Sequence, residues 1–167
     1  MNQALWTNGV YINIPANARL EQSLFLNIRT NSHSPFCRLF VDVEAGADAG
    51  LVTKISSGNR QGVSLVVEEV RVGKGAKFDH GLVYAQKAGD TCHFTHRAAL
   101  ERDAQYNYVT ASFGKGRLKA DVGSAMKGVG AVSNIRSFTL LENDSQSDLH
   151  TLHHHEMDHT FSDLKFR

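Results

Sequence analysis

The sequence predicts an all-β protein whose chain winds into a right-handed parallel β-helix, with stacked coils of about 27 residues. Three observations support this fold class. No segment keeps apolar residues at the i, i+3, i+4, i+7 spacing of an amphipathic helix over three turns. Apolar and polar residues instead alternate in many short segments, which is typical of strands with one buried face. A turn-like dipeptide ending in alanine also recurs at a nearly constant interval, as in repeat architectures.

Strands are expected wherever this alternation or a dense apolar cluster occurs. The first alternating segment contains Val10, Ile12 and Ile14, and the pattern returns at residues 39–43 and 70–72. Denser apolar clusters occur at residues 24–26, 65–67, 82–84 and 140–141. Each segment has the length of a strand, so we predict a chain that is mostly β.

The expected turns carry the repeat. An alanine follows Gly, Asn or Asp at Ala18, Ala49, Ala76, Ala104 and Ala131, so the intervals between successive alanines are 31, 27, 28 and 27 positions. Gly, Asn and Asp tolerate a left-handed backbone best, and a small alanine at a corner leaves room for the next coil. Helical repeats would need two helices per unit, and propeller blades need about 40 residues. A β-sandwich, the main alternative, would place turn signals every 8–12 residues.

Composition limits the function classes. A chain of 167 residues can form one core, so we expect a single domain over residues 1–167. The formal net charge of +1 argues against nucleic-acid binding, and the apolar runs are too short for a membrane span. Two cysteines form no disulfide framework and no signal peptide opens the chain, so we expect a cytoplasmic protein. No nucleophile or phosphate-loop motif occurs, so we expect no enzymatic activity.

A histidine-rich segment near the end of the chain is the first candidate metal site. In a strand, Asp148, His150 and His154 would share one face, and His159 follows shortly after. Imidazoles combined with a carboxylate can bind zinc or iron, so His150, His154 and His159 are the candidate ligands. A polar strand face at a subunit interface explains the same pattern without a metal.

Cys92 and His96 form a second candidate site. These two residues would share a strand face, and a thiolate with an imidazole can ligate zinc. A structural zinc site needs four ligands, however, and the spacing of the sequence provides no second pair. An ordinary structural role therefore competes with metal binding here.

The ends of the predicted stack need protection. A terminal coil exposes unpaired N–H and C=O groups, so it must be capped or must pair with another chain. The last residues, 162–167, end in mid-pattern without Gly or Pro. We expect a stack that is incomplete at its C-terminal end, or a subunit that completes itself by association.

Several segments resemble the SufB/SufD core-domain family. Residues 8–15 (NGVYINIP) resemble the start of that domain, and residues 39–47 (LFVDVEAGA) are similar to its apolar strand ending in Glu-x-Gly-Ala. Residues 148–151 (DLHT), with the later His154 and Ser162, resemble the SufD signature Asp-x-His-Thr. The resemblance spans nearly the whole chain.

This resemblance implies a right-handed parallel β-helix that acts in cytosolic or plastid iron–sulfur cluster assembly. The implied partners are SufB-like and SufC-like subunits, the latter an ABC-type ATPase. The resemblance implies no required cofactor, only a transient iron–sulfur cluster or iron at a subunit interface.

The chain also departs from the family pattern. Leu100 stands where SufB members carry a functional cysteine, and Arg167 stands where the family often has lysine. The family's further coils, with a Cys-x-His-Gly-Ala stretch, and its helical SufC-binding segment do not follow. Leu100 at the cysteine position favours a SufD-like protein over SufB, and the resemblance transfers no cluster ligand to this chain.

We therefore expect a non-enzymatic scaffold, a truncated SufD-like core that pairs with another β-helix subunit. The alternative is a small metal-binding β-helix or cupin-like protein that uses the cluster between His150 and His159. A further alternative is an oligomerisation domain that self-associates through its exposed end coils.

Overall fold

The structure, a computed structural model, describes residues 6, 8–30, 36–57 and 62–167. These residues form strands joined by turns, and they contain no helix, so the described part offers no helix that could cross a membrane. The strands are β1 (Asn8–Ile14), β2 (Leu24–Thr30), β3 (Phe36–Val43), β4 (Asp48–Ser57), β5 (Val63–Val72), β6 (Lys77–Gln86), β7 (Thr91–Leu100), β8 (Gln105–Gly114), β9 (Arg117–Met126), β10 (Val132–Leu141), β11 (Gln146–His155) and β12 (Phe161–Phe166).

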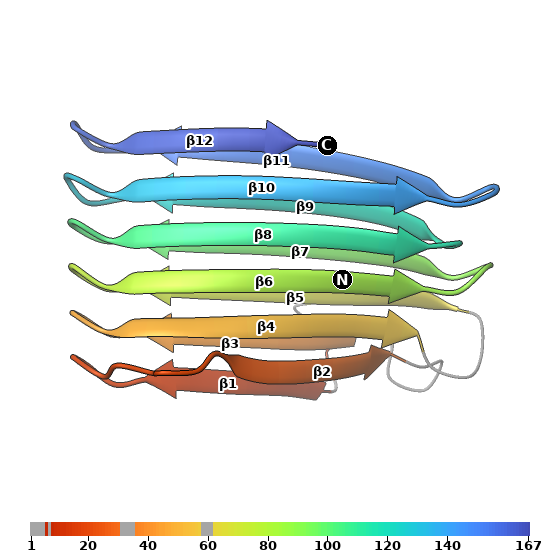
Figure 1. The fold of residues 1–167 in the computed structure, drawn as a ribbon, viewed down its shortest axis with the longest axis horizontal. Coiled ribbons are helices and arrows are strands. Elements are labelled where there is room, and N and C mark those ends of the chain that lie inside the picture. The colour runs from red at the N-terminus through yellow and green to blue at the C-terminus, as the bar shows by residue number, and fades with distance from the viewer. Residues whose placement is uncertain (1–5, 7, 31–35, 58–61) are drawn as a thin grey trace.

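The strands form two facing parallel sheets, and each coil contributes one strand to each sheet (Figure 1). One sheet has the order β1-β3-β5-β7-β9-β11 and the other β12-β10-β8-β6-β4-β2. Thr91 pairs with Arg117, 26 positions later, and Lys77 pairs with Gln105, 28 positions later. The parallel β-helix is therefore confirmed, and its coil length agrees with the repeat that the sequence predicts.

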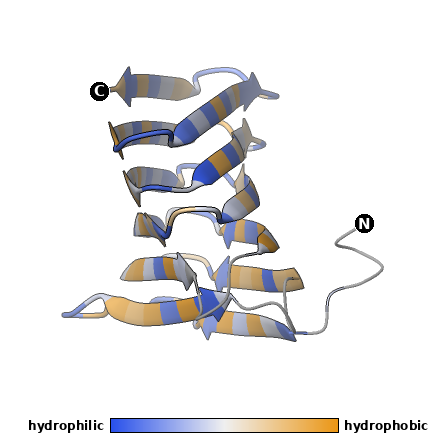
Figure 2. Cartoon of the chain, turned by 90° about the vertical axis from the view of Figure 1, so that its right-hand side faces the viewer, coloured by the Kyte–Doolittle hydropathy of each residue, from blue (hydrophilic) through white to orange (hydrophobic). Residues whose placement is uncertain are grey.

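Alternation along each strand separates the core from the surface. Hydrophobic and hydrophilic residues alternate along the strands of both sheets (Figure 2). Every second side chain of the middle strands is buried, as in β5 and β7. The inward side chains of the middle coils are the most deeply buried, among them Val72, Phe78, Leu100, Tyr106 and Met126. One continuous core thus runs along the stack.

Left-handed residues form the turns that lead from odd-numbered to even-numbered strands. Positive φ angles occur at Asn17 (61°), Gly46 (69°), Gly75 (64°), Asp103 (57°) and Gly130 (76°). Each is followed by an alanine, so the predicted turn signal is confirmed at four of its five positions. The prediction of a turn at Ala49 is wrong, because that residue lies inside β4.

The second turn uses Gly46 and Ala47 instead. With Ala47 in place of Ala49, the intervals between successive turn alanines become 29, 29, 28 and 27 positions, which is more regular than the sequence analysis indicated. The turns also continue the hydrogen-bonded ladder, since Gly46 N donates to Lys74 O and Gly75 N donates to Arg102 O, both at 2.9 Å. Stacked turns and stacked strands therefore share one register.

Candidate functional site

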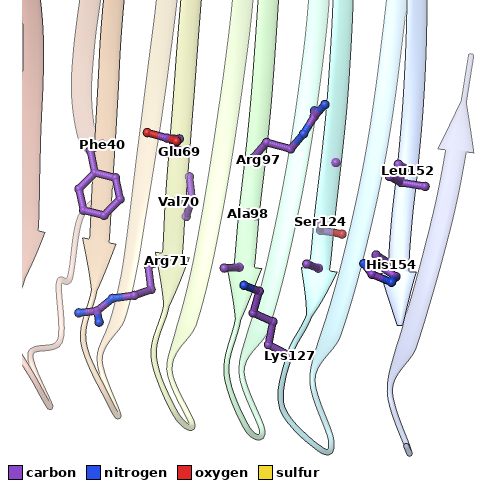
Figure 3. Close-up of a pocket in the computed structure, with 13 residues that line it drawn as sticks. Phe40, Glu69, Val70, Arg71, Arg97, Ala98, Ser124, Lys127, Leu152 and His154 are labelled. Carbon is purple, nitrogen blue, oxygen red and sulfur yellow. The ribbon is translucent and has the colours of Figure 1, made fainter. Parts of the chain in front are cut away.

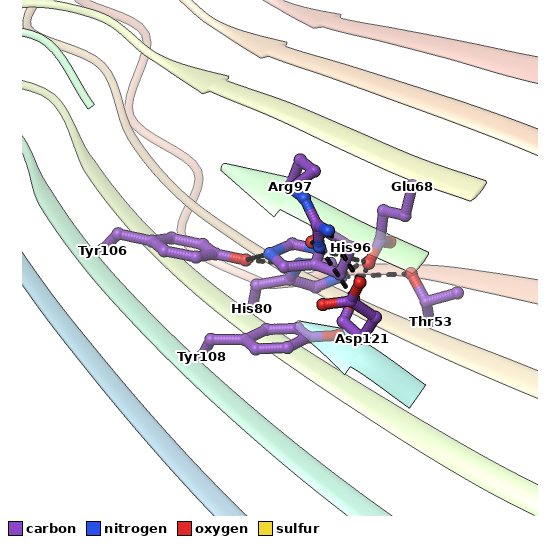
Figure 4. Close-up of polar contacts among 8 residues, drawn as sticks. All are labelled: Thr53, Glu68, His80, His96, Arg97, Tyr106, Tyr108 and Asp121. Carbon is purple, nitrogen blue, oxygen red and sulfur yellow. Dashed lines mark hydrogen bonds and ion pairs between the residues drawn. The ribbon is translucent and has the colours of Figure 1, made fainter. Parts of the chain in front are cut away.

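A compact group of polar side chains lies in the core at the centre of the stack (Figure 4). We call it the interior cluster. None of its side chains is more than 2% exposed, although each carries a polar group. Its members are Thr53 of β4, Glu68 of β5, His80 of β6, His96 of β7, and Tyr106 and Tyr108 of β8.

The strand register brings these residues together. Glu68 is the ladder partner of His96 in one sheet, and His80 is the ladder partner of Tyr108 in the other. All four occupy inward positions of strands whose other inward residues are mostly apolar. In the adjacent coils, the corresponding inward positions are apolar: Leu39, Val122, Leu51 and Ile135. The cluster is thus a local polar interruption of two apolar columns.

Short contacts close the cluster into a ring. Glu68 Oε2 lies 2.9 Å from His96 Nδ1, and Glu68 Oε1 lies 3.3 Å from His80 Nε2. The Tyr106 hydroxyl completes the ring, because it lies 3.1 Å from both His96 Nε2 and His80 Nδ1. Thr53 Oγ1 lies 3.3 Å from His80 Nε2. Glu68 Oε1 lies within ion-pair distance of His80, but it accepts no hydrogen bond from the described residues.

Burial shifts the protonation of the cluster toward its uncharged forms. It raises the pKa of Glu68, although the nearby His80 opposes this shift. Burial lowers the pKa of His80 to about 4 and that of His96 to about 3, and the Arg97 charge contributes to the second shift. Both imidazoles are therefore neutral at pH 7, each with one N–H donor and one acceptor nitrogen.

The chemistry open to the interior cluster follows from its enclosure. Glu68 and the two imidazoles can pass a proton around the ring, but their burial keeps them from contacting a substrate. The ring also connects the sheets, because Glu68 and His96 belong to one and His80 and Tyr106 to the other. In the part of the chain that the structure describes, no group of three or more His, Cys, Asp or Glu residues is arranged to hold a metal ion.

The structure places the predicted histidine ligands on the last coil. His150 and His154 lie on the outer face of β11 with Asp148, as the alternation predicted, and His159 lies in the following turn at φ 56°. His154 Nδ1 is 3.4 Å from Glu156 Oε1, whereas His150 Nδ1 is 3.9 Å from Asp121 Oδ1. Four strand residues span about 13 Å, so the structure does not bring the two rings together.

Cys92 and His96 share the inward face of β7, but Phe94 lies between them. The same strand geometry separates their backbones by about 13 Å. Burial raises the pKa of the Cys92 thiol to about 11, so the thiol is protonated at pH 7. His96 instead contacts Glu68. Metal binding by either predicted set stays a prediction.

The sequence analysis missed the partners of His96, although a signal for them existed. Glu68 and His96 are 28 positions apart in the sequence, and so are His80 and Tyr108. A separation of one repeat places two residues side by side in adjacent coils, so polar residues at this interval indicate a buried contact. Glu69 points the opposite way to Glu68, to the outer face, where it accepts a 2.6 Å hydrogen bond from Arg38.

One comparison with known protein families gives a match. A family model described as "SUF system FeS cluster assembly, SufBD core domain" matches residues 26–167, which is most of the chain. A search of curated proteins gives no match.

Proposed function

The chain belongs to the SufBD core-domain family of the SUF iron–sulfur cluster assembly system, and we propose that it is a scaffold subunit there. In this proposal, a SufD-like core without enzymatic activity pairs with a second β-helix subunit and with an ABC-type ATPase. The nascent iron–sulfur cluster is the cargo of the complex. The sealed position of the interior cluster supports a scaffold role, because its acid–base groups have no contact with solvent.

The observation that carries the proposal is the family match, which covers residues 26–167 and is described as part of the SUF system. We propose the β11–β12 edge of the described stack as the pairing surface, because the inward apolar side chains Leu164 and Phe166 of β12 are 39% and 49% exposed there. A second β-helix offers strands and apolar side chains that complement such a coil.

Co-purification with SufB-like and SufC-like subunits from the same source tests this proposal. We expect a stable complex with the wild-type chain, and its loss when Leu164→Asp and Phe166→Asp are combined. Val109→Asp is the matched control, because Val109 is a 48% exposed apolar residue on the outer face of β8, away from the edge. Absence of any complex would refute the scaffold role, and a complex insensitive to the edge substitutions would refute this pairing surface.

A further inference from the structure

A hollow lies on the outer face of the sheet formed by the odd-numbered strands (Figure 3). Its volume is about 460 Å³, and its lining runs from β3 across β5, β7 and β9 to β11. Small outward residues line its middle, namely Ala99, Gly123 and Ala125. Phe40 and Leu152 stand at its two ends, and both side chains are exposed.

The fold itself does not require the glycine in this hollow. Gly123 lies within strand β9 and has no positive φ angle. A Cβ atom added there would approach nothing closer than 3.4 Å, which is ordinary contact. A glycine inside a strand weakens the strand and often marks the close approach of a ligand or another chain. The packing of the fold alone therefore does not explain the hollow.

Among the described residues, one cationic side chain at the hollow has no acidic partner. Arg97 donates to Asp121 Oδ2 at 2.8 Å, and Arg71 donates to both carboxylate oxygens of Asp42 at 2.7 Å. Glu69, the acidic residue of the lining, is paired with Arg38. The exposed Lys127 has no acidic partner within the described ranges. An occupant that brings a carboxylate to Lys127 would complement the surface.

We propose that this hollow binds an extended peptide segment of a partner protein, in which a large apolar side chain and an acidic side chain two positions away face the sheet together. Five strands at a spacing of about 4.8 Å span about 19 Å, which is the length of about six extended residues. The apolar side chain fills the space above Gly123, and the acidic residue pairs with Lys127. This site lies on a sheet face, so it is independent of the edge pairing proposed above.

Fluorescence polarisation with a labelled hexapeptide, DELDFE, tests the proposal on the full chain. We expect saturable binding, and no binding of the basic peptide KKLKFK. Gly123→Leu fills the hollow and Lys127→Glu reverses its free charge, so each should weaken binding about tenfold or more. Because Gly123→Leu could disturb β9, the charge variant tests the site separately.

Matched controls exist for both substitutions. Gly81 is a strand glycine on the outer face of the other sheet, where an added Cβ would meet nothing closer than 3.5 Å, so Gly81→Leu adds the same side chain elsewhere. Lys119→Glu reverses an exposed charge on β9 outside the hollow. Equal losses in variants and controls, or equal binding of both peptides, would overturn the proposal. Self-association that Gly123→Leu abolishes would also overturn it, because a second copy would then be the occupant.

Discussion

Glu68 is the residue on which the interior cluster depends, because its carboxyl group contacts histidines of both sheets. A buried pair is weak evidence for stability in itself, since burial of the polar groups costs free energy. Removal of one member is different, because the remaining groups stay buried without partners. Glu68 therefore matters most through the donors and acceptors that its loss would leave unsatisfied.

We expect Glu68→Leu to lower the free energy of unfolding by about 2–4 kcal/mol, because His96 Nδ1 would lose its 2.9 Å partner. Glu68→Gln keeps the shape and can still form hydrogen bonds, so its cost should be below about 1 kcal/mol. Urea unfolding of both variants measures the difference. A Glu68→Leu protein as stable as the wild type would show that the ring contributes nothing to stability.

The buried histidines also predict a pH dependence. In the unfolded chain they bind protons below their ordinary pKa of about 6.5, whereas in the fold His80 binds one only near 4 and His96 near 3. The unfolded state thus binds more protons between pH 6.5 and 4, so stability falls as the pH falls through this range. The raised pKa of Glu68 acts in the opposite direction, because the folded state then binds up to one proton more at this carboxyl group than the unfolded state does. The net loss is about 1.4–2.7 kcal/mol per pH unit.

Urea unfolding at pH 7, 6 and 5 measures this slope. His96→Gln should reduce it by about 1.4 kcal/mol per pH unit, because one titrating group is removed. His93→Gln makes the same substitution on the exposed face of the same strand and is the matched control. Identical stability at pH 7 and pH 5 would contradict the shifts of both histidines.

Sequence reasoning found one member of the interior cluster but not its surroundings. His96 stood out because Cys92 lies four residues before it, a local pattern that is easy to detect. Its actual neighbours come from other coils, and they can be identified only once the exact register between coils is known. A shift of one residue would turn Glu68 to the surface, so an approximate period was insufficient.

At the scale of elements, the turns decide how closely coils stack. Gly128 precedes the left-handed Gly130 by two residues, and Gly73 precedes Gly75 in the same way. A Cβ atom on Gly128 would overlap the backbone of Arg102 in the previous coil, whereas one on Gly75 would meet nothing within 4 Å. The two glycines are therefore needed for different reasons: close approach at Gly128 and backbone conformation at Gly75.

Alanine substitutions should separate these two reasons. Gly75→Ala places an L-residue at φ 64° and should cost about 1–2 kcal/mol of unfolding free energy. Gly128→Ala forces two backbones apart and should cost about 3 kcal/mol or more. Thermal and urea unfolding of the two variants provide the comparison. Equal losses would mean that the coil spacing at this turn is adjustable.

The fold was predictable at this scale because each coil repeats the same local signals. The alternation of apolar and polar residues predicted the strands. The Gly, Asn or Asp before each alanine predicted most of the turns. The turn at Gly46 was misplaced by two residues because Asp48 and Ala49 present the same residue types as a real turn. Such residues tolerate a turn without forcing one, so only the pairing of neighbouring coils decides between them.

At the scale of the whole molecule, the stack is a one-dimensional array. Each strand pairs only with the strands two places before and after it, so stability depends on contacts between adjacent coils. The interior cluster occupies β4 to β8, in the middle of this array, and links its two sheets. The edge strands have neighbours on one side only, and Leu164 and Phe166 of β12 are poorly covered.

We therefore expect amide hydrogen exchange to be slowest in β5 to β8 and fastest in β11 and β12, since end coils can open without disrupting the centre. Exchange followed by mass spectrometry at pH 7 resolves these segments. Glu68→Leu should accelerate exchange in β5 to β8 selectively, because it removes the contact between the sheets there. Binding of a β-helix partner should slow exchange in β11 and β12, because their backbone groups would become paired. A single uniform rate along the chain would show that the stack opens only as a whole, and it would contradict independent opening of its ends.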